Sequence, residues 1–127
     1  MKKFIYIIAA AALALGLSSC NMKIENPSER NFKGTWDLQS TETTYKDGTV
    51  STSPVKSLDY LVITDKTIAF YDADKLSRQA SFAVKDNVIY VDGYASYDVV
   101  SLTLREMTLR QDGLLGLYTV KYNYKKR

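Results

Sequence analysis

The sequence predicts an all-β domain, and three observations support this fold class. Outside residues 1–19, the β-branched residues Val, Ile and Thr number 9, 4 and 11, and 13 aromatic residues accompany them. Such side chains fit a pleated surface. Alanine falls to five in the same part of the chain, which disfavours helices. Turn-forming residues also divide the chain at near-regular intervals. We therefore expect an antiparallel meander of about eight strands, forming a small barrel or a flattened sandwich.

The first nineteen residues have the features of a secretory signal. Lys2 and Lys3 precede an uncharged, apolar stretch of fourteen residues, 4–17. A transmembrane helix needs roughly 20 apolar residues, and this shorter run has the length of a signal-peptide core. It ends in Leu17-Ser18-Ser19-Cys20, which resembles the bacterial lipobox. The resemblance implies cleavage before Cys20 and acylation of this cysteine, as in palmitate-bearing lipoproteins. The alternative is an unmodified cysteine behind an ordinary secretory signal.

Acylation of Cys20 would divide the chain into three successive segments. We expect a lipoprotein signal peptide over residues 1–19, a lipidated tether over residues 20–33 and the β domain over residues 34–127. Residues 21–33 are polar and lack a sustained period, as a tether would. Two or more acyl chains give lasting membrane attachment. By resemblance to other envelope lipoproteins, Asn21 after the cysteine favours the outer membrane. Whether the domain faces the periplasm or the cell surface stays open.

Nine segments of the β domain have strand character, and turn residues separate them. The expected strands are residues 34–44, 49–52, 58–64, 67–71, 79–84, 88–91, 97–103, 106–111 and 115–124. Turns are expected at Lys46-Asp47-Gly48, Asp65-Lys66, Lys85-Asp86-Asn87 and Asp112-Gly113. One helical turn is expected over residues 72–77.

Alternation of apolar and polar residues predicts which side chains share a face. In the last strand, Tyr118, Val120, Tyr122 and Tyr124 alternate with polar residues, so one face of the sheet is apolar and rich in tyrosine. Earlier in the chain, Val100, Leu102 and Leu104 are expected together on one face.

Gly34-Thr35-Trp36 opens the first strand of the domain. A G-x-W motif in front of an all-β meander resembles the lipocalins and, more closely, the small lipocalin-like lipoproteins of Gram-negative bacteria. Residues 100–110 look like the penultimate hairpin of that group, and residues 117–122 look like its closing strand. The resemblance covers residues 32–124.

The resemblance implies a role for Trp36 in closing one end of a barrel. Glycine lets the chain bend tightly before the strand. In the lipocalins, a basic residue from a late strand covers the tryptophan ring, and Arg110 is the residue that we expect there, with Lys121 as the second candidate. An exposed, carbohydrate-stacking Trp36 is the alternative. The typical Thr-Asp-Tyr motif and C-terminal helix of lipocalins are missing, and the domain is short, so its interior could be filled by side chains.

Composition restricts the chemistry of any site. The chain has no histidine and one cysteine, so it cannot hold a Ser-His-Asp triad, a Cys-His pair or a multi-thiolate zinc site. Asp72-Ala73-Asp74 lacks the remaining ligands of a calcium loop. We predict no catalytic residue, no metal and no cofactor. A hydrolase using Asp59, Asp98 and Glu106 is the least favoured of three functional hypotheses.

The tyrosines suggest what the domain could bind. Tyrosine offers a ring and a hydroxyl together and suits a pocket for an amphiphile, although it also fills small cores. The expected ligand-lining residues are Tyr60, Phe82, Tyr90, Tyr118, Tyr122 and Tyr124. Lys2 and Lys3 lie in the signal, which leaves 15 basic against 14 acidic residues, so nucleic acid is not an expected partner. We expect a monomeric binding module for a small hydrophobic or amphipathic ligand. The alternative is a structural or protein-interaction module of the envelope, or an inhibitor, with a solid core.

Overall fold

The computed structural model describes residues 22–127. The predicted signal peptide and the predicted acylation of Cys20 lie outside the described residues. Within the described part, no helix is long and apolar enough to cross a membrane.

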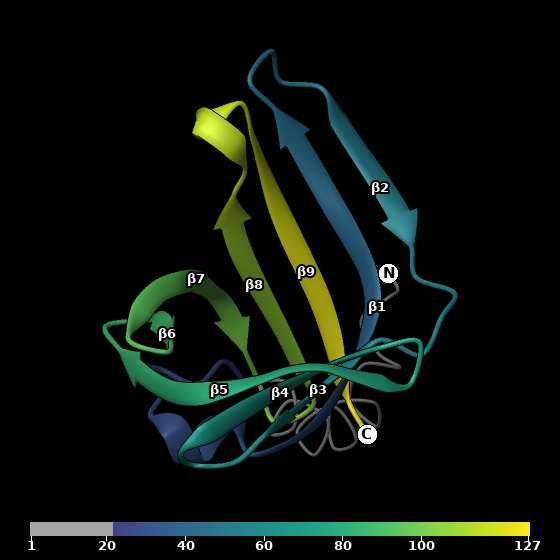
Figure 1. The fold of residues 1–127 in the computed structure, drawn as a ribbon. Coiled ribbons are helices and arrows are strands. Elements are labelled where there is room, and N and C mark those ends of the chain that lie inside the picture. Colours follow the sequence, from purple (N-terminus) through teal and green to yellow (C-terminus); the bar gives the residue numbers. More distant parts are fainter. Residues whose placement is uncertain (1–21) are drawn as a thin grey trace, which may run out of the picture.

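Nine strands form one continuous antiparallel sheet (Figure 1). They are β1 (Gly34–Tyr45), β2 (Val50–Pro54), β3 (Tyr60–Ile63), β4 (Thr67–Asp72), β5 (Lys75–Lys85), β6 (Val88–Val91), β7 (Tyr94–Leu102), β8 (Glu106–Asp112) and β9 (Tyr118–Lys126). Two short 3₁₀ helices, η1 (Glu29–Phe32) and η2 (Leu114–Gly116), accompany them. Neighbours in the sheet follow the order β2-β1-β3-β4-β5-β6-β7-β8-β9, and β9 also pairs with β1. Eight strands therefore close into a meander barrel with β2 as an extra strand, which confirms the all-β prediction and selects the barrel over the sandwich.

The long strand β1 belongs both to the barrel and to an open sheet above it. Residues 34–37 pair with β3, whereas residues 40–44 pair with β2 on the same edge. Along its other edge, β1 pairs with β9 from Trp36 opposite Lys126 to Tyr45 opposite Tyr118. The upper parts of β8, β9 and β1, together with β2, consequently rise beyond the ring of strands, at the top of Figure 1.

The other end of the barrel is closed by the chain that precedes β1. The indole Nε1 of Trp36 donates a hydrogen bond of 2.7 Å to the carbonyl oxygen of Phe32, and both side chains are fully buried. The ring of Phe32 packs edge-on against Phe82, with 5.8 Å between centroids. The amide of Ile24 donates to the carbonyl oxygen of Leu102 over 2.7 Å. The residues from 24 to 32, within the expected tether, therefore pack against the barrel and plug it.

The basic residue over Trp36 comes from β9 and corrects the expectation for Arg110. Lys126 Nζ lies 5.4 Å from the centroid of the Trp36 ring. Arg110 instead forms a half-exposed ion pair with Asp98, 3.0 Å between nitrogen and oxygen. The register explains the difference, because Lys126 is the residue of β9 directly opposite Trp36, whereas Arg110 lies opposite Lys121, well along the strands.

The helical turn expected over residues 72–77 is wrong. Residues 73 and 74 form the tight turn of the β4–β5 hairpin, and β5 already begins at Lys75. Ala73 and Asp74 have φ angles of +49° and +66°, the pair of left-handed conformations that suits the right-handed twist of a hairpin. The amide of Ala73 donates to the Asp59 carboxylate over 2.9 Å, which fixes the turn against the residue before β3.

Candidate ligand-binding site at the open end of the barrel

The interior of the barrel is solid from its closed end up to the level of Tyr124. Aliphatic and aromatic side chains from all eight strands of the ring and from the plug fill it. The buried core consists of Phe32, Trp36, Leu61, Ile63, Ile68, Ala80, Phe82, Ile89, Val91, Leu102, Met107, Leu109 and Tyr124. A large internal ligand chamber of the kind that some barrels enclose has no room below this level.

Above the core, a cavity of about 160 Å³ opens at the barrel mouth. Its lining residues are Leu38, Asp59, Tyr60, Leu61, Phe70, Asp72, Tyr97, Tyr122 and Tyr124. A cavity of this size resembles one that holds a benzene ring, whereas pockets for drug-sized ligands are about 300–1,000 Å³. The mouth can therefore enclose a ring or the head of a ligand, and the rest of a larger ligand must lie outside it.

Three tyrosines from two strands meet in the mouth. Tyr122 and Tyr124 point inward from β9 because they alternate with outward residues, as the sequence predicts. Tyr97 of β7 packs edge-on against Tyr122, with ring centroids 6.0 Å apart and an angle of 85°. The hydroxyl of Tyr122 donates to Gln111 Oε1 over 3.2 Å, and Gln111 Nε2 donates to the carbonyl oxygen of Ser96. Gln111 thus holds one tyrosine and links β8 to β7.

Tyr124 carries the unusual polar group of the mouth. The residue is 8% exposed, and its hydroxyl makes no hydrogen bond with any other residue between 22 and 127. The hydroxyl oxygen is nevertheless not sealed from solvent, because no fully buried side-chain oxygen in the described structure lacks a partner. Burial raises its pKa strongly, and the nearby tyrosines and the carboxylates of Asp59 and Asp72 raise it further. Burial also raises the pKa of Tyr97 and of Tyr122. All three phenols therefore stay protonated and can both donate and accept hydrogen bonds at physiological pH.

Two carboxylates flank the tyrosines. Asp59 precedes β3 and Asp72 ends β4, so both lie where the strands leave the core. Among residues 22–127 the ion pairs join Arg78 to Asp92, Arg110 to Asp98 and Arg127 to Asp37. Neither Asp59 nor Asp72 takes part in one. The mouth therefore combines an apolar floor, three phenols and two carboxylates that form no ion pair within residues 22–127, with Arg127 over the ring of Tyr60 at its border.

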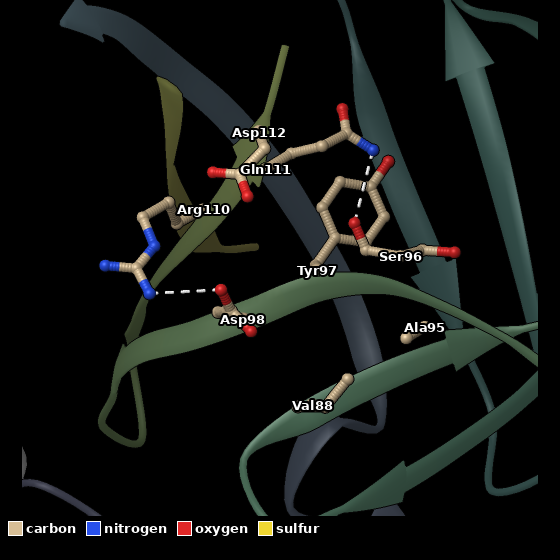
Figure 2. Close-up of a pocket in the computed structure, with 8 residues that line it drawn as sticks. All are labelled: Val88, Ala95, Ser96, Tyr97, Asp98, Arg110, Gln111 and Asp112. Atoms are coloured by element: carbon tan, nitrogen blue, oxygen red, sulfur yellow. Dashed lines mark hydrogen bonds and ion pairs between the residues drawn. The ribbon is translucent and has the colours of Figure 1, made fainter. Parts of the chain in front are cut away.

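A second hollow lies where β7 and β8 diverge (Figure 2). Its volume is about 370 Å³, and its lining residues are Val88, Ala95, Ser96, Tyr97, Asp98, Arg110, Gln111 and Asp112. Figure 2 shows Arg110 paired with Asp98 on one side and the amide of Gln111 reaching Ser96 on the other. These polar groups already satisfy one another, and the ion pair is half exposed to water. We therefore take the mouth, where the Tyr124 hydroxyl lines the cavity and has no partner among residues 22–127, as the candidate site.

The expected ligand-lining residues occupy five different places. Tyr122 and Tyr124 lie in the mouth. Tyr60 borders it, but its ring stacks on Tyr71 at 4.6 Å and lies under Arg127. Phe82 belongs to the core near the plug, and Tyr118 lies above the mouth beside Tyr45.

Tyr90 lies on the outer face of the barrel. It pairs with Ala83, whereas the pairs on either side, Phe82 with Val91 and Val84 with Ile89, point into the core. Sequence reasoning missed Tyr97, Asp59 and Asp72 as members of the mouth. The alternation of Tyr97 with the inward Val99 was the one signal that could have indicated Tyr97.

Comparison with known proteins adds no functional assignment. No protein-family model, no curated protein and no solved structure matches the chain significantly. The eight-strand antiparallel meander barrel is consistent with a lipocalin-like fold. Fold alone does not specify function, which depends on the side chains that form the site at the mouth.

Proposed function

We propose that this chain is a lipid-anchored, non-catalytic lipoprotein of the cell envelope that binds a small amphipathic ligand at the barrel mouth. The observation that carries the proposal is the mouth cavity, which places Tyr97, Tyr122 and Tyr124 over an apolar floor. Concave, mostly apolar sites with a few convergent polar groups are typical of small-molecule binding.

The shape of the molecule indicates how such a ligand would lie. The floor of Leu38, Leu61 and Phe70 suits an apolar group of the size of a ring or a short chain. Above the mouth, the open sheet continues the inner face of β9 and β1, where Val120 lies opposite Thr43. Both are half-buried and leave a surface of mixed polarity beside the cavity. A ligand longer than the cavity would extend along this surface.

A lipid anchor at Cys20 would attach to the end of the barrel opposite the mouth. Residues 21–23 separate Cys20 from Ile24, whose amide is bonded to Leu102 near the closed end. Four residue steps span at most about 14 Å of extended chain. Acyl chains on Cys20 would thus hold the closed end towards the membrane and leave the mouth accessible from the aqueous side.

A matched pair of variants on β4 tests the binding site. Phe70 lines the cavity, whereas its neighbour Tyr71 stacks on Tyr60 outside it. We expect short-chain amphiphiles to shift the NMR signals of Tyr97, Tyr122 and Tyr124 in a saturable way. Phe70→Trp should abolish these shifts by filling the cavity, and Tyr71→Trp should leave them unchanged. Absence of saturable shifts with cationic, neutral and anionic hexyl amphiphiles alike would overturn the proposal.

The anchor has its own test. Mass spectrometry of the protein extracted from membranes should find an acylated amino-terminal Cys20, and Cys20→Ala should release the protein from the membrane fraction. An unmodified cysteine in membrane-extracted protein would refute the anchor and leave the binding site untouched.

A protein-interaction module is the second candidate, and the tip of the open sheet favours it. Leu114, Leu115 and Leu117 are 69%, 88% and 51% exposed. Leu115 also has a φ of +55°, an unfavourable backbone conformation for leucine. Exposed apolar groups on a strained turn suit contact with another envelope protein. A photo-crosslinker at position 115 in living cells should then capture one defined partner, and Leu115→Asn should prevent the contact.

A further inference from the structure

We infer that the mouth selects an organic cation, so that the ligand is an amphiphile with an ammonium head. This inference rests on the proposed function, since it specifies the ligand of the same site. Its basis is the meeting of Tyr97, Tyr122 and Tyr124 with the carboxylates of Asp59 and Asp72 around one cavity.

The carboxylates give the mouth a negative charge that no basic residue within 22–127 neutralises by an ion pair. Arg78, whose charge acts on Tyr97, and Arg127, which lies over Tyr60, are already paired with Asp92 and Asp37. The loops around the mouth also carry a net negative charge. The connections at residues 72–75 and 112–117 hold Asp72, Asp74 and Asp112 against Lys75, while residues 55–59 hold Asp59 against Lys56. A cation entering the mouth would therefore gain favourable electrostatic energy, and an anion would lose it.

The aromatic rings supply the second attraction. A cation is attracted to the face of an aromatic ring within about 6 Å of its centroid. Tyr97 and Tyr122 stand nearly perpendicular, at 85°, so they present surfaces in two directions around the same space. Rings arranged around a cavity with nearby carboxylates are the type of environment that receives alkylammonium groups. The cavity of about 160 Å³ has room for such a head and little more.

The hydroxyl of Tyr124 supplies the third attraction. It lines the cavity, is 8% exposed as a residue, and has no hydrogen-bond partner among the described residues. An ammonium N–H could donate to this oxygen, which lines the cavity and has no protein donor among the described residues. A quaternary head would use the rings and carboxylates alone, so a primary and a quaternary amine distinguish the two modes.

A metal ion fits the site less well. Within residues 22–127, no group of three or more acidic or cysteine side chains is arranged as metal ligands. Calcium takes six to eight oxygen ligands, mostly carboxylates and carbonyls. Two carboxylates among neutral phenols and an apolar floor match an organic cation better.

The test compares ligands that differ only in their heads. Hexyltrimethylammonium, hexylammonium, hexyl sulfate and hexyl glucoside are titrated into the unlipidated chain 20–127 by calorimetry, since all elements of the barrel lie within residues 22–127. We expect both cations to bind at least ten-fold more tightly than hexyl sulfate. Tyr124→Phe should weaken hexylammonium more than hexyltrimethylammonium.

Paired carboxylate variants locate the selectivity. Asp59→Asn with Asp72→Asn should remove most of the ten-fold preference and leave hexyl glucoside binding unchanged. Asp65→Asn with Asp86→Asn changes the net charge equally in turns at the closed end of the barrel, outside the cavity lining, and should preserve the preference. Equal affinity for all four hexyl compounds would overturn the inference while the proposed function stands. So would a preference for the cations that persists in the Asp59→Asn, Asp72→Asn variant. If none of the four compounds binds, both the inference and the proposed function are overturned.

Discussion

Lys126 Nζ lies 5.4 Å above the ring of Trp36, the first buried residue of β1. The two residues are directly opposite each other where β9 closes the barrel onto β1. Gly34 lies under the lysine stem, since a Cβ at this position would approach Lys126 Cε to 2.7 Å. Its φ of +136° also favours glycine. The start of β1, the plug and the end of β9 are therefore joined at one point.

Trp36→Phe should destabilise the domain by about 2 kcal/mol, because it removes part of a fully buried side chain and leaves the carbonyl of Phe32 without its donor. Urea unfolding monitored by circular dichroism measures the change. Tyr90→Phe, on the outer face, serves as the control and should change stability by less than about 0.5 kcal/mol. Equal effects of the two variants would contradict the role of Trp36 as the end of the core.

Lys126→Met should lower the free energy of unfolding by about 0.5–1 kcal/mol at low salt, since it keeps the length of the stem but removes the charge above the ring. Lys125→Met removes an equal charge from the neighbouring residue. A larger loss for the Lys125 variant would show that net charge, rather than the contact with Trp36, determines the effect.

The sequence predicted the strands well because their signals are local. Alternation in residues 118–124 correctly placed Tyr122 and Tyr124 on the inner face, and the turn residues at 65–66 and 86–87 do join consecutive strands. The G-x-W motif correctly indicated the closed end. These features depend on side chains a few positions apart, which a single sequence displays directly.

What the sequence could not predict depends on register between strands. A bulge between Val99 and Ser101 places both Val99 and Leu102 against the core, so the face expected for Val100, Leu102 and Leu104 changes halfway along the strand. Leu104 is exposed in the turn after β7. In the same way, the partners of Trp36 and of Tyr122 are set by pairing across the sheet, which explains why Arg110 was expected over Trp36 and why Tyr97 was missed.

Glu29→Gln should reduce stability at neutral pH and have little effect in acid. The amide of Val84 donates to the Glu29 carboxylate over 2.8 Å, and this bond holds the pKa of Glu29 below its usual value of 4.5. A lowered pKa in the folded state stabilises above the unfolded pKa, and this contribution is lost as pH falls through the folded pKa. Denaturation at pH 7 and at pH 3 measures the difference between the two proteins. A gap that stays constant over this range would exclude the titration of Glu29 as its cause.

Ala73→Gly should raise the free energy of unfolding by about 0.5–1 kcal/mol, because Ala73 has a φ of +49° that costs alanine more than glycine. Ala95→Gly, in an exposed part of β7, should lower it instead, since glycine weakens a strand. A loss of stability with Ala73→Gly would show that the turn between β4 and β5 has another backbone conformation in solution.

Loss of the hydroxyl should lower the stability of the protein at Tyr122 but not at Tyr124, the two tyrosines of β9 in the mouth. Tyr122→Phe removes the donor to Gln111 Oε1 and should cost about 1 kcal/mol. Tyr124→Phe removes a hydroxyl that has no partner among the described residues and that reaches the cavity rather than being sealed from solvent, so it should change stability by less than about 0.5 kcal/mol. Urea unfolding of both variants without ligand measures this contrast. A hydroxyl that contributes little to the stability of the free protein and lines the mouth is available to a ligand. Destabilisation by Tyr124→Phe as large as that by Tyr122→Phe would mean that the Tyr124 hydroxyl is already bonded in the free protein, and would remove this argument for a binding role.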